Sequence, residues 1–580
     1  MQRDTDLPNG RATLGRLAHD AAAGANLALT MLPKAMAYAV VAGVPPVYGL
    51  YASCAAPALA VAFGSNRLLF TGPVGVMTVL VLGSLNHFAP PFSPAYIELA
   101  AALTLMVGVL ALLFAAARLG FLIRAIPTPV TEGFIAAAAL LIIGTQVGPA
   151  LGAPSPAAHS GIHLPAFLAE AAEAWARRDV LVPTLFVVCV AVALVARRFL
   201  PRTPEALIVL GLAFAATFAW DLNARGVEMV GALPTGLPPV SVPSLAPLLS
   251  GQIWASAALL ALVGMTETSS ISRFVARRTT QRFDPGREAV GQGLANVAVA
   301  FVGGYPVCAS VSGTSVNLAG GARGPRPIYV FTVLALLVAL SLGPLFAYLP
   351  RFALAAVVIM AVASLLDPRP LLTLCRADRL DALIVFTTFG VTLLVGPEPG
   401  ILAGVAAAWL CYLCRTRLVP VHERLWRPAG ASDESAPVCL VLCPCSSFLY
   451  PNAEAIHDEA LRLALARGLP VVLDLSAAPF LDADGAEAIR DLAAACGAAG
   501  LPLVFAGAAG SVLDKLKAAG VLVFGSRSRP WRRPAPTPSP NGSRRRARRL
   551  RDKPPYCSAF SSCRLLIFDR PGMSRAFARR

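Results

Sequence analysis

An acidic residue inside an apolar segment is the first candidate for chemistry. Glu267 lies within residues 255–272, a stretch that is otherwise apolar or small enough to cross a bilayer. A carboxylate at membrane depth costs about 2.5–3.5 kcal/mol on insertion scales, so its presence there indicates a partner or a task. Glu267 is therefore predicted to be a proton or cation relay, or part of a substrate site.

Two predicted membrane segments are too short to cross about 30 Å of hydrocarbon. One follows Thr71-Gly72-Pro73, the other follows Gly303-Gly304-Tyr305-Pro306, and each is third in its group of seven segments. Paired interruptions of this kind indicate a transporter site built on inverted repeats. The N-termini of the two half-helices would direct N–H groups and positive dipole ends at one point, which would hold an anion. The alternative is two ordinary helices kinked by Pro and Gly.

The composition is that of a polytopic membrane protein. Of 580 residues, 56% are hydrophobic and 14% are charged, with a mean hydropathy of +0.66, whereas a soluble domain is about 25% charged. The net charge of +17 is concentrated in residues 526–580, which hold sixteen Lys or Arg against two Asp. We expect this tail to be disordered, with no specific nucleic acid as its partner.

Arginine placement orients fourteen predicted spans. With the N-terminus inside, only four arginines between the first and last span fall in outside loops. This positive-inside bias predicts an even span number, with both termini cytoplasmic and the chain in the cell (inner) membrane. The predicted spans lie near residues 22–42, 47–65, 72–84, 95–117, 125–148, 181–196, 205–220, 254–275, 286–303, 312–321, 327–347, 351–366, 380–396 and 398–414.

Beyond residue 435 the pattern becomes that of a small soluble α/β domain. Short apolar strands alternate with helices, one of them starting at Asn452 and ending at Gly468. We therefore divide the chain into a cytoplasmic N-terminal segment, a transmembrane transport domain, a linker, an α/β domain and a basic tail. The respective boundaries are 1–19, 20–417, 418–435, 436–525 and 526–580.

Several motifs in this order resemble the SulP family, sulfate permease-like anion transporters with a C-terminal cytoplasmic STAS domain. They lie at residues 32–39, 43–51, 129–134, 288–296 and 473–476. The resemblance covers roughly residues 15–525. It implies a 7+7 inverted repeat with core and gate domains, an elevator-type movement of the core, and a homodimer.

The resemblance also implies site residues by position. The anion would bind between the third and tenth spans, with the first span beside them, and Glu267 matches an acid associated with proton coupling. The residues assigned to the anion in this way are Lys34, Tyr38, Val74, Ser310, Ser312 and Gly313.

Three positions depart from the family pattern. Relatives often carry Gln at the position of Lys34 and Arg at the position of Gly313. We therefore hypothesise that a cation has moved from the tenth span to the first, or that Lys34 neutralises Glu267. The alternatives are a lysine that snorkels to the interface and a glycine kept for packing. In the STAS part, Asp482 and Asp484 occupy the regulatory region, where relatives place a phosphorylatable Ser. We predict that Asp484 is a helix cap rather than a phosphate-like signal.

These observations predict a secondary active inorganic anion transporter that couples sulfate uptake to protons. The alternatives are a bicarbonate or dicarboxylate transporter, with sodium as another coupling ion, and a membrane-tethered STAS regulatory protein with degenerate transport. The expected partners are the anion, protons, the lipid bilayer and a cytoplasmic protein on the STAS domain. The histidines and cysteines have no metal-ligand spacing, so we expect no metal, no cofactor and no enzyme activity.

Overall fold

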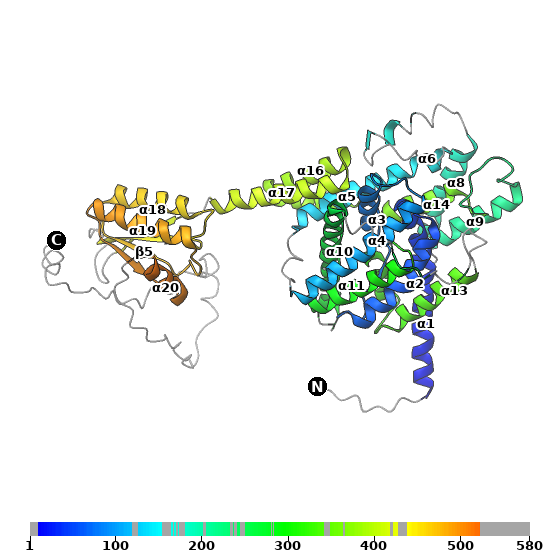
Figure 1. Ribbon diagram of the computed structural model, residues 1–580, viewed down its shortest axis with the longest axis horizontal. Helices are drawn as coiled ribbons and strands as arrows, with labels where there is room; N and C mark the ends of the chain where they lie inside the picture. Colours follow the sequence, from blue (N-terminus) through cyan, green and yellow to red (C-terminus); the bar gives the residue numbers. More distant parts are fainter. Residues whose placement is uncertain are drawn as a thin grey trace, which may run out of the picture.

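The chain forms a large helical domain followed by a small α/β domain (Figure 1). The structure is a computed structural model. It describes residues 10–118, 126–152, 164–165, 167–169, 172, 180–200, 205–231, 236, 240–243, 250–279, 281, 283–341, 348–363, 366–417, 421–426 and 438–521. The predicted basic tail lies outside the described residues.

The helical domain consists of two successive sets of helices. The first set comprises α1 (Gly10–Val41), α2 (Pro46–Phe63), α3 (Gly75–Leu85), α4 (Pro94–Ala116), α5 (Thr128–Thr145), α6 (Val147–Leu151), α8 (Leu181–Phe199) and α9 (Glu205–Trp220). The second set comprises α10 (Gly251–Arg278), α11 (Pro285–Phe301), α12 (Val311–Ala319), α13 (Arg326–Ser341), α14 (Arg351–Ala363), α15 (Pro368–Ala377), α16 (Arg379–Leu394) and α17 (Pro397–Arg417).

Each of the fourteen predicted segments overlaps one of these helices. In the described part of the chain, five helices are long and apolar enough to cross a membrane: α2, α4, α5 continued by α6, α8 and α17. Shorter apolar helices are α3, α9, α13 and α14. Large apolar side chains such as Val187 and Trp409 are exposed, as expected for helices that face lipid. The number of crossings stays a prediction.

Local sequence sets several helix starts. Ser93, Asp284 and Asp367 each precede a proline, and each side chain accepts a hydrogen bond from a backbone N–H in the first turn of the helix that follows. A short polar side chain satisfies an otherwise unpaired N–H, and proline fits the first helical position because its missing N–H would be unpaired there. These caps fix where α4, α11 and α15 begin.

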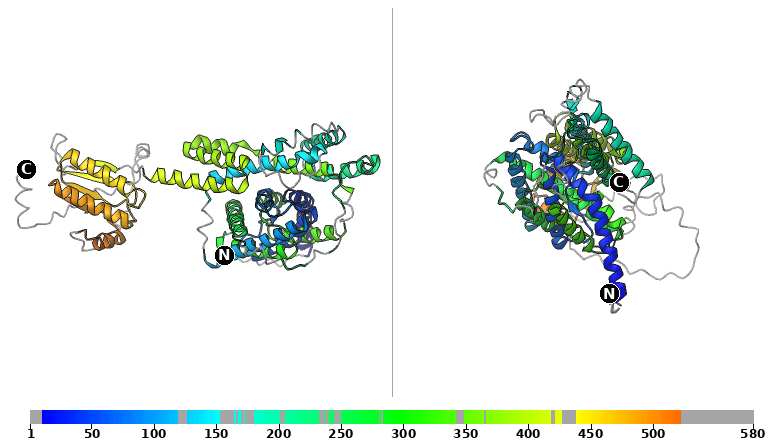
Figure 2. Two further views of the ribbon diagram at one scale, coloured as in Figure 1. Left: turned by 45° about the horizontal axis from the view of Figure 1, so that its top comes forward. Right: turned by 90° about the vertical axis from the view of Figure 1, so that its right-hand side faces the viewer.

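The helices pack in two layers (Figure 2). The first layer contains α1, α2, α4 and α10–α13, and the second contains α5, α6, α8, α9 and α14–α17. Helix α3 belongs to the first layer and packs against α5 and α17 of the second, while α1 reaches α9 and α14. Corresponding helices of the two sets thus share a layer, as an inverted repeat with a core and a gate would require.

A close approach between α2 and α11 explains one glycine of the 288–296 motif. A Cβ built on Gly291 would stand 2.7 Å from the backbone nitrogen of Gly64 and 2.8 Å from the carbonyl oxygen of Ala60. No side chain fits between backbones at this separation. Gly291 therefore allows α11 to pack directly on the end of α2.

The α/β domain has a four-stranded sheet in the order β3-β4-β5-β6. Strand β3 pairs antiparallel with β4, and the other pairs are parallel. The helices bury Ile456, Ile489 and Leu516 in its core. The elements are β3 (Val421–Trp426), β4 (Cys439–Pro444), α18 (Ala453–Arg467), β5 (Val471–Asp474), α19 (Ala483–Ala498), β6 (Leu503–Ala506) and α20 (Gly510–Ala518).

Strand β3 of this domain was not predicted from the sequence. Strand β3 falls inside residues 418–435, which we predicted to be a linker. It is an edge strand with mostly exposed side chains, so it lacks the apolar alternation that predicts a strand. The predicted helix from Asn452 to Gly468 is confirmed, and Gly468 ends it in the left-handed conformation at φ +60°.

Candidate anion site

The two interrupted segments lie side by side. Thr71 and Gly72 form β1, which pairs antiparallel with β2 (Cys308–Ala309), so that Thr71 faces Ala309 and Gly72 faces Cys308. Helix α3 starts three residues after β1, and α12 starts two residues after β2. The prediction that the two breaks meet is therefore confirmed. The N-terminus of each half-helix carries a partial positive charge, so the pair favours an anion between them.

Ser310 and Ser312 lie at the start of α12. Ser310 is its N-cap, and its hydroxyl oxygen accepts a hydrogen bond of 3.1 Å from the backbone N–H of Gly313. The two hydroxyl oxygens are 3.3 Å apart. At the start of α3 the capping residue is Val74, which has no side-chain oxygen to offer. The N-terminus of α3 therefore presents backbone alone, while that of α12 adds hydroxyl groups.

Helix α1 contacts both half-helices. The ring of Tyr38 is 3.4 Å from where a Cβ of Gly75 would stand, at the start of α3. Met31 places its sulfur 3.9 Å from the hydroxyl of Ser312. Helix α1 thus places Tyr38 at the start of α3 and Met31 beside Ser312 at the start of α12. That Tyr38, Val74, Ser310 and Ser312 bind the anion stays a prediction.

Lys34 lies elsewhere on α1. It lines a small pocket with Glu205 of α9, and the other walls come from α8 and α14. The acid that shares its surroundings is Glu205 rather than Glu267. The hypothesis that Lys34 replaces a cation at the start of α12 therefore gains no support from this geometry.

Gly313 has a packing reason to be glycine. A Cβ at this position would stand 2.3 Å from Cδ1 of the Phe70 ring. Of the two alternatives left open for Gly313, the structure favours close packing.

Glu267 lies against β2. One face of α10 carries Gly264, Glu267 and Thr268 at helical spacing. Glu267 and Thr268 hydrogen bond with the Cys308–Ala309 segment, and a Cβ built on Gly264 would stand 3.4 Å from the Cβ of Cys308. The thiol of Cys308 donates to Oε2 of Glu267 at 3.6 Å, and the backbone N–H of Ala309 donates to the hydroxyl of Thr268 at 3.3 Å. The acid predicted for coupling therefore contacts Cys308, which lies two residues before Ser310, the cap of α12.

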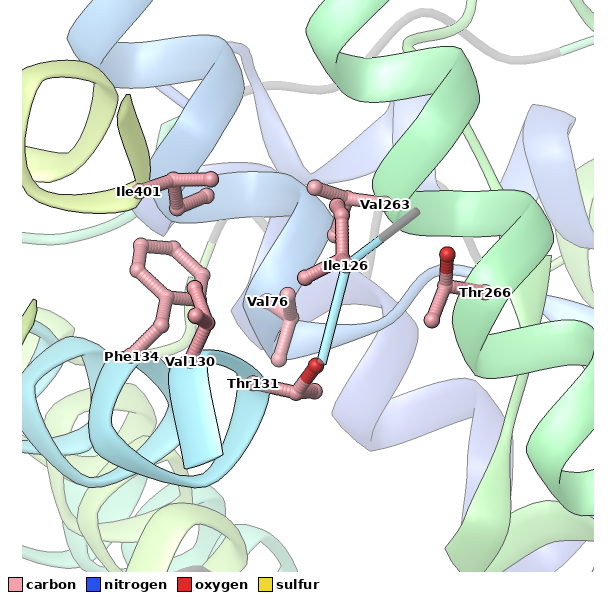
Figure 3. Close-up of a pocket in the computed structure, with 8 residues that line it drawn as sticks. All are labelled: Val76, Ile126, Val130, Thr131, Phe134, Val263, Thr266 and Ile401. Atoms are coloured by element: carbon pink, nitrogen blue, oxygen red, sulfur yellow. The ribbon is translucent and has the colours of Figure 1, made fainter. Parts of the chain in front are cut away.

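A pocket lined by Thr266, the residue before Glu267, lies between the two helical layers (Figure 3). Figure 3 shows Val76 of α3 between side chains of α5 and α10, with Thr131 and Thr266 supplying the hydroxyl groups. Glu132 follows Thr131 on α5, is half-buried, and interacts electrostatically with Glu267. Sequence reasoning placed Glu132 in a family motif but gave it no role, because only packing reveals that it approaches Glu267.

The two acids predicted for the regulatory region of the STAS domain, Asp482 and Asp484, have different roles. Asp482 is the N-cap of α19, and it accepts hydrogen bonds from the backbone N–H groups of Gly485 at 2.8 Å and Tyr450 at 2.6 Å. Asp484 lies exposed in the first turn. The prediction that Asp484 is the cap is therefore wrong, since the extended backbone that a cap needs occurs at Asp482. Among the described residues, no cluster of three or more His, Cys, Asp or Glu could hold a metal.

Comparisons with known proteins agree with this architecture. The profile of the Sulfate permease family matches residues 17–388, and that of the STAS domain matches residues 432–527. A "Probable sulfate transporter" of Mycobacterium tuberculosis is 32% identical over 404 residues, 68% of this chain and 70% of that protein.

Two solved structures share the fold. The murine Solute Carrier 26 family member A9 anion transporter in the inward-facing state superposes with a TM-score of 0.78 at 18% identity, over 90% of this chain and 93% of that one. The transmembrane domain of the cyanobacterial bicarbonate transporter BicA superposes with a TM-score of 0.57 at 21% identity, over 68% of this chain and 97% of that one.

Proposed function

This chain belongs to the sulfate permease family, and we propose that it is a secondary active transporter that takes up sulfate. The observation that carries the proposal is the pairing of β1 with β2, which sets the N-termini of α3 and α12 beside each other. Two helix N-termini and the hydroxyls of Ser310 and Ser312 offer donors to a tetrahedral dianion. The likeness to a protein described as a sulfate transporter supports the choice of anion.

We further propose that Glu267 couples uptake to protons. Its carboxylate contacts Cys308, next to the residues that start α12. A negative charge there opposes the binding of an anion, so protonation of Glu267 and binding of the anion would favour each other. The proton gradient would then drive uptake.

The conformational change that carries the anion across the membrane would be a shift of the first layer, which contains both half-helices, against the second layer. The contacts between the layers involve mainly α1 and α3, so the boundary contains few elements that must rearrange. An elevator-type movement of this kind would carry the bound anion across while the second layer stays fixed. We propose a homodimer in the cell membrane with both termini cytoplasmic, on family membership and arginine placement.

Bicarbonate is the second candidate substrate, because the transmembrane fold also matches that of a bicarbonate transporter. That likeness, at 21% identity, supports a shared fold and leaves the anion to measurement. A regulatory protein without transport is disfavoured, since the paired breaks are intact.

Uptake into proteoliposomes tests the proposal. Sulfate, bicarbonate and fumarate are offered in parallel, with and without an inward proton gradient. We expect sulfate uptake to rise with the gradient. Glu267→Gln should lose this dependence while sulfate–sulfate exchange persists, and Glu98→Gln, an exposed acid on α4, should behave as the wild type. Gradient-driven uptake by Glu267→Gln would disprove the coupling role, and absence of sulfate transport by folded protein would disprove the substrate.

A further inference from the structure

The thiol of Cys308 touches the Glu267 carboxylate. Its Sγ lies 3.6 Å from Oε2 of Glu267 and 3.5 Å from the backbone carbonyl oxygen of Ala309. The thiol is buried at 2% exposure, and its backbone pairs with Gly72 in the β1–β2 ladder. It therefore lies between the acid of α10 and the segment that leads into α12.

A thiol has a single proton, so Cys308 donates to one of these two acceptors at a time. An ionised Glu267 is the stronger acceptor, because hydrogen bonds to charged groups are stronger than those to neutral ones. A protonated Glu267 leaves the thiol free to turn to the Ala309 carbonyl. We propose that Cys308 is a positioning residue for Glu267, which holds the ionised carboxylate against β2 and sets the pH at which the acid takes up its proton.

The contacts around Cys308 explain how this reaches the anion site. Thr268, the next residue on α10, accepts a hydrogen bond from the N–H of Ala309, so α10 is held to β2 at two consecutive residues. Ser310, the cap of α12, follows directly. A change of hydrogen-bond partner at Cys308 therefore acts on Cys308 and Ala309, the two residues that precede the cap of α12.

The helices packed around Glu267 carry few other titratable groups among the described residues. Helix α3 carries no titratable residue, α4 carries Tyr96 and Glu98, and α11 carries Arg287 and Glu288 in its first turn. Tyr96 donates its hydroxyl to the carbonyl of Ala42, and Glu288 accepts from the Ser65 segment. Glu132 on α5 is an acid that interacts electrostatically with Glu267. It is unchanged in the variants below.

The inference rests on the proposed proton coupling, and the pH dependence of uptake tests it. Cys308→Ala removes the donor, so the carboxylate takes up its proton more readily, and the pH of half-maximal uptake should rise by about half to one unit. Cys308→Ser keeps a donor, so its midpoint should stay at or below that of the wild type. Cys189→Ala and Cys189→Ser are matched controls at another buried cysteine, on α8, and should leave the midpoint unchanged.

The outcomes separate the inference from the proposed function. Equal midpoints for the wild type and both Cys308 variants, or equal shifts for Ala and Ser, would overturn the role of Cys308 while coupling stands. A lower rate at every pH with an unmoved midpoint would show that Cys308 only packs. Wild-type uptake that does not respond to pH would remove the coupling role of Glu267 itself.

Discussion

Gly313 and Phe70 are in direct contact at the start of α12, with no room for a side chain at Gly313. The ring of Phe70 packs edge-to-face on Phe331, with centroids 4.8 Å apart, so it cannot easily move aside. The backbone of Phe70 also accepts from the N–H of Ser310 at 2.8 Å and donates to the hydroxyl of Thr314 at 3.1 Å. Phe70 thus fixes the helix start by both its backbone and its ring.

Gly313→Ala should disturb this helix start. Overpacking of a tight contact costs about 1–3 kcal/mol, so we expect a lower melting temperature and weaker sulfate uptake. Phe70→Leu in the same chain should restore part of both, because it makes room for the methyl group. Gly390→Ala is the control, since a Cβ there meets nothing within 4 Å. If Gly313→Ala melts and transports as the wild type does, the contact with Phe70 does not constrain the site.

The sequence predicts some parts of this site well and others poorly. The paired breaks after Gly72 and Gly304 are predictable, because Gly and Pro interrupt short apolar segments at matching places. The surroundings of Lys34 are not predictable in this way. Lys34 and Tyr38 lie four residues apart on α1 and so share a face only approximately, and the packing of the other helices decides which neighbours each side chain meets. The same holds for Gly313, whose reason is Phe70, far away in the sequence.

A second prediction concerns Glu288 in the 288–296 motif. Its buried Oε2 accepts from the N–H and hydroxyl of Ser65, at 3.0 and 2.7 Å, and from the N–H of Asn66 at 3.2 Å. Glu288→Ala leaves these buried and half-buried donors without their acceptor, which we expect to cost about 2–4 kcal/mol of stability. Thermal unfolding in detergent measures this loss.

Two further variants check the assignment of Glu288. Ser65→Ala removes one of the three donors and should be milder. Glu98→Ala removes an exposed acid on α4 and should leave the melting temperature unchanged. A melting temperature of Glu288→Ala equal to that of Glu98→Ala would show that these bonds do not stabilise the fold.

A third prediction separates Asp482 from Asp484. Asp482→Ala loses the bonds to Gly485 and Tyr450, and cap replacements cost about 0.5–2 kcal/mol. Asp484→Ala removes only a favourable charge in the first turn, so its effect should stay within about 0.5 kcal/mol. Hydrogen exchange of the α19 amides in the full chain measures both. Faster exchange in Asp484→Ala than in Asp482→Ala would reverse the assignment.

The last prediction concerns the pH dependence of the contact between β3 and α18. Arg467 donates to Glu423 through Nε at 3.1 Å and a terminal nitrogen at 2.6 Å, and this hydrogen bonding lowers the pKa of Glu423. A lowered pKa in the folded state stabilises the fold at pH values above the ordinary value of about 4.3, and the benefit is lost as the pH falls through the lowered value. Glu423→Gln should therefore melt slightly below the wild type at pH 7, and the difference should vanish near the acid end of the range.

Because the Glu423–Arg467 pair is exposed, the effect on the melting temperature is small. Arg490→Ala, which breaks an exposed pair within α19, provides a matched comparison. A difference between Glu423→Gln and the wild type that persists unchanged in acid would mean that shape, and not charge, holds β3 against α18.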